Sequence, residues 1–354
     1  MTLTLHPPSV DDTRSALADW LELETLFSSR QQASKASLTG VLDFVEEEIA
    51  GEHESDDDSR GDRILEDAKR EAIVSSAFEE LSYRQKTLGG SYPFSLDPTR
   101  LVLHRSVPAP GNTTGQTIYL FCLLVSAIRG GGLQPAPKGL EKRIGNVFQV
   151  CACLAAGGYV NGEVVSFGFP RATGTDFMPA LKSAYERFGM CALRSEIPDG
   201  FPDSLKDGGI DIIAWRDHPD RMPGKLYLLG QCASGKNWSG KSVVEYIEQL
   251  HGAWFTQRPA SHCFPAIFIP FTMHGDLGEK RRGPYMEALR NSFWFHELRF
   301  GIVFDRLRIV HFSNLLLQQD EAIRETVDGN TLLPQVKEWV DELLEVEDST
   351  QAAA

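Results

Sequence analysis

Three polar residues near the ends of two neighbouring apolar runs have the types and spacing needed for chemistry. Asp211 lies in the run "IDIIAW" (210–215), Gln231 lies near the end of "LYLLGQC" (226–232), and Lys236 follows it. A charged side chain in an apolar strand is costly unless it binds a partner. Metal-assisted cleavage of a phosphodiester needs a carboxylate for the cation, a second ligand, and a positive charge near the attacking water. Two adjacent strands carrying Asp211, Gln231 and Lys236 could supply all three.

The segments around these residues resemble a known superfamily. The carrying motifs are "NVFQVCACLAAGGYV" (146–160), "DGGIDIIAW" (207–215) and "GQCASGK" (230–236). They resemble the PD-(D/E)XK, or restriction-endonuclease-like, nucleases, in particular the Mrr-like branch that has Gln in the acid position. In that branch a helix of the form F-E-x-x-x-x-x-x-L precedes G-G-x-D and a strand ending in Q-x-K. The resemblance covers about residues 141 to 275.

This resemblance implies a role for each matching position. Asp211 would be the principal metal ligand, Gln231 the acid or amide position, Cys232 a ligand through its backbone carbonyl, and Lys236 the catalytic lysine. The cofactor would be Mg²⁺ or Mn²⁺ and the substrate DNA, cut by water attack on a phosphodiester.

The sequence departs from the family pattern in two ways. The family lysine lies two residues after the acid or amide, where this chain has Ala233, so Lys236 requires a bulged strand and Lys241 is the reserve candidate. Gln149 replaces the helix glutamate, and Asp207 is a candidate second carboxylate. Fewer carboxylates mean weaker metal binding, which leaves open a catalytically inactive module that keeps the fold and binds nucleic acid or a partner protein.

Two further alternatives concern the same residues. Asp211 could be a structural buried acid paired with Lys236 or Arg216. The letters "GKNWSGKS" (235–242) also fit the phosphate-binding pattern G-x-x-x-x-G-K-[ST] of a P-loop nucleotidase. Only about 110 residues follow Ser242, which is short for a nucleotide-binding α/β domain, and the bulky Trp238 would lie where backbone must wrap phosphate. The P-loop is therefore the weaker interpretation.

The remaining sequence predicts an α/β (α+β) protein with a mixed central sheet flanked by helices, restriction-endonuclease-like, preceded by a mostly helical N-terminal domain. From residue 140 onward the pattern predicts helix, strand, a further helix, two strands, helix and strand, with a helix end at Gly157–Gly158 and a strand or hairpin over 301–312. The expected parts are a helical domain with an acidic loop (1–130), a Gly/Pro-rich linker (129–139), a nuclease domain (140–320) and a C-terminal acidic helix (330–348).

Charge is distributed unevenly along the chain. The formal net charge is −14, and residues 43–71 hold thirteen acidic against four basic residues. The part from 72 to 338 is close to neutral, which is compatible with DNA as a partner. The best basic cluster for phosphate contact is Lys280, Arg281 and Arg282 in "GEKRRGPY".

Location and partners follow from composition and from the resemblance. The six cysteines lack metal-ligand spacing, no signal peptide is evident, and the most apolar run, "TIYLFCLLVSAI" (117–128), is too short to cross a bilayer. We therefore expect a cytoplasmic protein without a membrane partner. The resemblance implies a restriction or anti-phage defence system, in which the acidic N-terminal part would recruit a protein partner encoded in a defence operon. Homo-oligomerisation stays open.

Overall fold

A computed structural model describes residues 3–50, 60–107, 111, 113–135, 137–171, 174–189, 191–196, 199–201, 206–273 and 284–351. The chain forms two compact units. Unit 1 comprises Met1–Pro137, Thr272–Ser292 and Asp341–Ala354, and unit 2 comprises Lys138–Phe271 and Phe293–Val340. The first boundary falls within the Gly/Pro-rich segment 129–139. The expected nuclease domain, 140–320, is interrupted by a segment of unit 1 and continues beyond its expected end.

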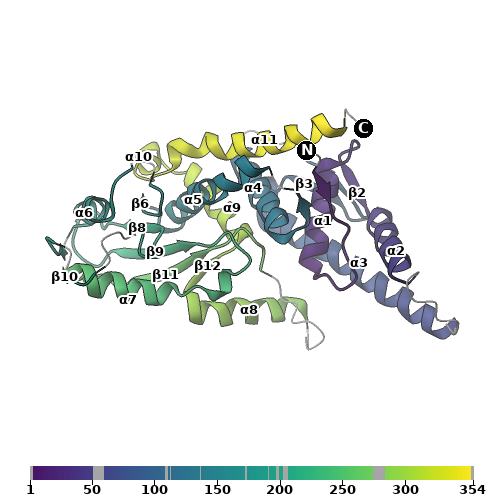
Figure 1. The fold of residues 1–354 in the computed structure, drawn as a ribbon, viewed down its shortest axis with the longest axis horizontal. Helices are drawn as coiled ribbons and strands as arrows, with labels where there is room; N and C mark the ends of the chain where they lie inside the picture. The colour runs from purple at the N-terminus through teal and green to yellow at the C-terminus, as the bar shows by residue number, and fades with distance from the viewer. Residues whose placement is uncertain are drawn as a thin grey trace. The chain divides into compact units, whose positions relative to one another are not determined.

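Unit 1 combines helices with a small antiparallel sheet (Figure 1). The strands of this sheet lie in the order β2, β4, β3, and a separate two-stranded pair joins β1 to β5. The bounds are β1 (Thr4–Leu5), α1 (Arg14–Phe27), β2 (Gln32–Ser34), α2 (Lys35–Ala50), α3 (Arg60–Leu88), β3 (Phe94–Asp97), β4 (Val102–Arg105), α4 (Thr113–Gly130) and β5 (Leu133–Gln134). Helix α4 contains the apolar run 117–128 and is buried along most of its length. Among the described residues, no helix combines the length and apolarity needed to span a bilayer.

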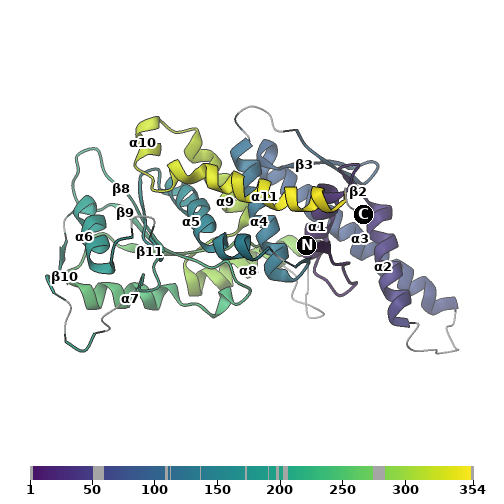
Figure 2. The same ribbon diagram turned by 45° about the horizontal axis from the view of Figure 1, so that its top comes forward.

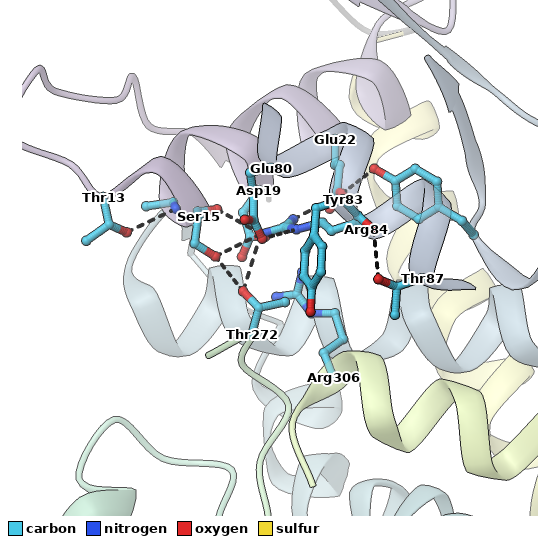
Figure 3. A network of polar contacts seen from close by, with 12 residues as sticks. Thr13, Ser15, Asp19, Glu22, Glu80, Tyr83, Arg84, Thr87, Thr272 and Arg306 are labelled. Atoms are coloured by element: carbon cyan, nitrogen blue, oxygen red, sulfur yellow. Dashed lines mark hydrogen bonds and ion pairs between the residues drawn. The ribbon is translucent and has the colours of Figure 1, made fainter. Parts of the chain in front are cut away.

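The core of unit 1 contains a buried guanidinium surrounded by carboxylates (Figure 3). Arg84 is fully buried; its Nε lies 3.0 Å from Glu80 Oε1, and its Nη1 lies 2.6 Å from Asp19 Oδ1 and 3.1 Å from Glu22 Oε1. Its Nη2 donates to Ser15 Oγ at 2.8 Å and to Thr272 Oγ1 at 3.3 Å. Burial lowers the pKa of Arg84, but Glu22, Tyr119, Asp19 and Glu80 outweigh it and raise that pKa well above its usual value. The cluster therefore joins α1, α3 and the segment that begins at Thr272.

Removing this guanidinium should destabilise unit 1 strongly. Arg84→Met leaves Asp19, Glu22 and Glu80 without their shared cation, and losing one partner of a buried ion pair costs about 3–5 kcal/mol. Urea denaturation followed by circular dichroism measures the loss. Arg100→Met is the matched control, because Arg100 is exposed and lies 3.9 Å from Asp97, so its midpoint should stay close to that of the wild type. Equal midpoints for both variants would contradict this account of the core.

Unit 2 is built on a five-stranded mixed sheet in the order β12, β11, β9, β8, β6. Strand β8 pairs antiparallel with both β6 and β9, whereas β11 pairs parallel with both β9 and β12. Helices α5 and α9 lie over one face of the sheet and α7 lies over the other (Figure 1). The sequence-based expectation of a mixed central sheet flanked by helices is confirmed. The strand bounds are β6 (Glu163–Ser166), β8 (Ile212–Arg216), β9 (Leu226–Cys232), β11 (Cys263–Phe268) and β12 (Ile302–Phe304).

The remaining elements include several that the expected order of helix and strand lacked, namely β7, β10, α8, α9 and α10 (Figure 2). The C-terminal helix predicted over 330–348 is present, and its residues are divided between the two units. Strands β7 and β10 form a separate antiparallel pair. The bounds are α5 (Lys138–Val160), α6 (Phe177–Phe188), β7 (Ala192–Leu193), η2 (Trp238–Gly240), α7 (Val243–Trp254), β10 (Phe255–Gln257), α8 (Tyr285–Phe300), α9 (Arg306–Leu317), α10 (Glu321–Glu325) and α11 (Leu333–Gln351).

Two sequence-based expectations about α5 and α9 are wrong. Helix α5 does not end at Gly157–Gly158 but continues to Val160. The two glycines instead allow α9 to pack closely, since a Cβ on Gly158 would lie 1.9 Å from the Phe312 carbonyl oxygen. The region 301–312 is not a hairpin. Strand β12 is followed by the cap residue Asp305, whose Oδ1 accepts from the Arg308 amide at 3.0 Å and starts α9.

The contact between α5 and α9 predicts a sharp difference between two glycines of the same helix. Gly158→Ala should destabilise unit 2 by about 1–3 kcal/mol or more, because its methyl group meets backbone rather than a side chain that can move. Gly145→Ala, which meets nothing within 4 Å, should be neutral or gain up to about 1 kcal/mol from better helix propensity. Chemical denaturation of both variants measures this difference. A stable Gly158→Ala variant would contradict the close packing.

Candidate functional site

The antiparallel pairing of β8 with β9 brings Asp211 to the end of β9. Asp211 directly precedes β8, and its neighbour Ile212 is paired with Gly230. The Asp211 amide donates to the Gly230 carbonyl at 2.9 Å, and the Cys232 amide donates to Asp211 Oδ2 at 2.7 Å. The Asp211 carboxylate therefore lies beside Gln231 and Cys232, although these residues are about twenty positions away in the sequence.

A turn after β6 and a side chain from α5 complete this side of the site. The amides of Phe167 and Gly168 donate to the Asp211 carbonyl at 2.7 and 3.1 Å. Gln149 Nε2 donates to Ser166 Oγ at 2.7 Å, which orients its amide. A Cβ on Gly168 would lie 2.3 Å from Gln149 Oε1 and 2.5 Å from Asp211 Oδ1. The two oxygens therefore converge on one small space that only glycine at position 168 leaves open.

Gln231 supplies a third oxygen. Its side chain is 6% exposed, and its Oε1 is buried without a hydrogen-bond partner among the atoms that the structure describes. A buried polar atom without a partner costs about 1–3 kcal/mol, so such atoms call for an explanation. Gln231 lines the same cavity as Gln149 and Asp211, with a volume of about 460 Å³. Gln231 follows Gly230, the partner of Ile212, so its side chain lies on the same face of the sheet as that of Asp211.

The two candidate lysines have different environments. Lys241 is half-buried, lines the cavity, and its Nζ donates to the Cys232 carbonyl at 3.2 Å. Lys236 is exposed in the turn before η2 and does not line the cavity. The Cys232 carbonyl, expected as a metal ligand, keeps a second lone pair beside Lys241. The basic residues Lys280, Arg281 and Arg282 lie outside the described residues.

Asp207, the candidate second carboxylate, accepts hydrogen bonds from two backbone amides. Its Oδ1 accepts from the Gly209 amide at 2.8 Å and its Oδ2 accepts from the Phe169 amide at 3.4 Å. It lines the cavity, and each of its two carboxylate oxygens accepts one hydrogen bond from a backbone amide. Asp207 therefore holds the turn before β8 against the loop after β6.

Sequence reasoning missed three residues of this site: Gly168, Phe169 and Tyr246. Gly168 provides the open space, and Phe169 and Tyr246 line the cavity. The glycine and proline of "FGFP" (167–170), which directly follows β6, were the available signal for the first two. Tyr246 lies in the first two turns of α7, where its aromatic ring appeared in the sequence as an ordinary amphipathic position.

Burial makes Asp211 an unusual carboxyl group. Its pKa is raised to about 6, mainly because burial disfavours the charged form. The hydrogen bond from the Cys232 amide lowers this pKa. The nearby charge of Asp207 raises the pKa, and that of Lys241 lowers it. A carboxylate with such a pKa in a cavity is typical of functional sites. A cation in the cavity would favour the ionised form.

The donor atoms fit a hard divalent cation better than zinc. Asp211, Gln149 and Gln231 offer carboxylate and amide oxygens, which Mg²⁺ and Mn²⁺ accept as ligands. Within the described ranges, no group of three or more His, Cys, Asp or Glu side chains is arranged to hold a metal ion. The convergent oxygens at Gly168 and the Gln231 oxygen are the features that fit a cation.

The P-loop interpretation finds little support in the loop between β9 and α7. The amides of Trp238, Gly240 and Lys241 donate to the carbonyls of Gly235, Asn237 and Trp238. A phosphate cradle requires backbone amides that face the ligand. These three amides are used within the loop itself.

Comparisons with known proteins add no assignment: no protein-family model, no curated protein and no solved structure matches the chain. The interpretation of the site therefore rests on its own geometry.

The raised pKa of Asp211 predicts a pH-dependent stability in the absence of metal. With EDTA present, the Asp211 carboxyl keeps its proton up to about pH 6 in the folded chain, whereas it loses this proton near pH 4 in the unfolded chain. Stability contributed by this group therefore falls as the pH rises from about 4 to 6, and the loss persists above that range. Asp211→Asn keeps an acceptor for the Cys232 amide and removes the charge, so it should be more stable than the wild type at pH 7.5, by no more than about 3 kcal/mol. Urea denaturation at both pH values measures the difference, and a gap that is the same at pH 4 and pH 7.5 would contradict the burial of this carboxyl.

Proposed function

We propose that unit 2 is a metal-dependent nuclease domain of the restriction-endonuclease-like kind, which hydrolyses DNA phosphodiester bonds. The observation that carries the proposal is the cavity that Asp211, Gln149, Gln231 and Lys241 line together, with Gln149 Oε1 and Asp211 Oδ1 both close to Gly168. The order of elements supports it as well. A helix with Gln149, a Gly208–Gly209 turn before Asp211, and a strand ending after Gln231 follow one another as the resemblance implies.

Each residue has a role that its contacts support. Asp211, with Gln149 and Gln231, would hold Mg²⁺ or Mn²⁺ through oxygen atoms. The cation would supply Lewis-acid stabilisation of the phosphate and lower the pKa of a bound water. The Lys241 ammonium group, held over the end of β9 by the Cys232 carbonyl, would offset negative charge that develops on the phosphate. This role falls to Lys241 rather than to Lys236, because Lys236 does not line the cavity.

The biological setting belongs to the same proposal. Restriction or anti-phage defence, a cytoplasmic location and DNA as the partner are what the resemblance implies for this chain. Unit 1 would serve recruitment, with a protein partner from a defence operon. The basic residues 280–282 would contact phosphate, and assembly with further copies of the chain stays open.

A second candidate function has one observation in its favour. Two of the three side chains proposed as ligands, Gln149 and Gln231, are neutral amides, which bind a cation more weakly than carboxylates do. The second nearby carboxylate, Asp207, is used for backbone amides. A nuclease-like module that binds nucleic acid or a partner protein without cleaving would have this composition.

Cleavage assays with variants test the nuclease proposal. The purified full-length chain is incubated with plasmid and linear DNA in Mg²⁺ or Mn²⁺. Asp211→Ala and Lys241→Ala should each lower the cleavage rate at least about 100-fold, as removal of one group that stabilises the transition state typically does. Lys236→Ala is the matched control and should stay within a few-fold of the wild type.

The contrary outcomes separate the candidates. Cleavage that persists in Asp211→Ala would remove this site from the proposal. A rate that falls in Lys236→Ala but not in Lys241→Ala would restore Lys236 as the catalytic lysine. DNA binding without cleavage in either metal would favour the non-catalytic module.

A further inference from the structure

Two aromatic residues, Phe169 and Tyr246, line the cavity. Phe169, in the loop after β6, lines the cavity and is 52% exposed. Tyr246, on α7, lines the same cavity and is half-buried. Two aromatic residues that line one polar cavity offer a surface on which a flat ligand can stack.

The chain holds both rings in place through one short turn. Asp207 accepts hydrogen bonds from the Phe169 amide at 3.4 Å and from the Gly209 amide at 2.8 Å. The Tyr246 ring packs directly on Gly209, where a Cβ would lie 2.5 Å from the ring atom Cγ. Gly209 also has a φ of +80°, which favours glycine. The Asp207 carboxylate therefore holds the backbone at Phe169 and at Gly209, and the Tyr246 ring packs on Gly209.

The polar groups of the cavity complement the edges of a nucleobase. Besides the proposed cation ligands, Asn146 lines the cavity with an amide side chain that offers both donors and an acceptor. Lys206 Nζ lies 5.8 Å from the centre of the Phe169 ring, where it can reach a phosphate attached to a stacked base. An aromatic face, amide edges and a nearby cation together match a nucleotide.

The base must be unpaired to use these groups. In a duplex, neighbouring base pairs cover both faces of each base, so a protein ring can stack on it only after it leaves the helix. We infer that the cavity receives an unpaired nucleotide, so that single-stranded DNA is the preferred substrate of the nuclease proposed above. The inference deepens that proposal and rests on it for the chemistry of cleavage.

Binding measured without cleavage tests this inference. The full-length chain in EDTA is titrated into a fluorescently labelled DNA strand of roughly 16 nucleotides, at the upper end of known single-strand site sizes, and into its duplex. The wild type should bind the single strand more tightly than the duplex. Phe169→Leu keeps an apolar side chain but removes the ring, and should weaken single-strand binding about tenfold while leaving duplex binding unchanged.

A matched control separates stacking from general effects on the surface. Phe264, on β11, is 47% exposed and does not line the cavity, so Phe264→Leu should leave both affinities unchanged. Tyr246→Leu should act in the same direction as Phe169→Leu, with its fold checked by circular dichroism. Duplex binding stronger than single-strand binding, or a Phe169→Leu affinity within twofold of the wild type, would overturn the inference.

The result is distinguishable from failure of the nuclease proposal. Ring-dependent binding of the single strand without cleavage in Mg²⁺ or Mn²⁺ would leave this inference standing and remove the catalytic role. Cleavage of duplex DNA that is insensitive to Phe169→Leu would support the nuclease proposal and remove this inference.

Discussion

The hydrogen bond from the Cys232 amide to Asp211 Oδ2 is the interaction on which the candidate site depends. This bond lies next to the last paired residues of β8 and β9, Ile212 and Gly230. The strand pairing that builds the sheet therefore also fixes the carboxylate next to Gln231. A one-residue slip of this register would turn Asp211 to the opposite face of the sheet. Fold and site share the same constraint.

Close backbone packing connects the helices to this constraint. Gly158 lets α9 approach α5, and α5 in turn carries Gln149 to the sheet. Gly168 leaves open the space on which the oxygens of Gln149 and Asp211 converge. The uncompensated Gln231 oxygen and the raised pKa of Asp211 are costs to stability. Such costs are typical of sites arranged for a ligand rather than for the fold alone.

The sequence was sufficient for the central sheet and for the pair Asp211 and Gln231. These residues lie on consecutive strands joined by a short connection, so local pattern alone brings them together. The sequence was insufficient where contacts between distant segments determine the local structure. The glycines of α5 resemble a helix stop because their packing partner, Phe312, is distant in sequence. Helix α9 was missed because β12 is only three residues long and Asp305 begins the helix immediately afterwards. The 3-10 turn η2, which lies between Lys236 and Lys241 in the sequence, carries no clear signal.

The central claim is that the oxygens of Asp211, Gln149 and Gln231 form a site for a hard cation. Anomalous X-ray diffraction from crystals of the full-length chain containing Mn²⁺ tests it most directly. The account predicts an anomalous peak in the cavity, within about 2.0–2.6 Å of an Asp211 carboxylate oxygen, that disappears in Asp211→Asn crystals. A cavity without a peak at saturating Mn²⁺, or a peak that persists in Asp211→Asn crystals, would contradict it.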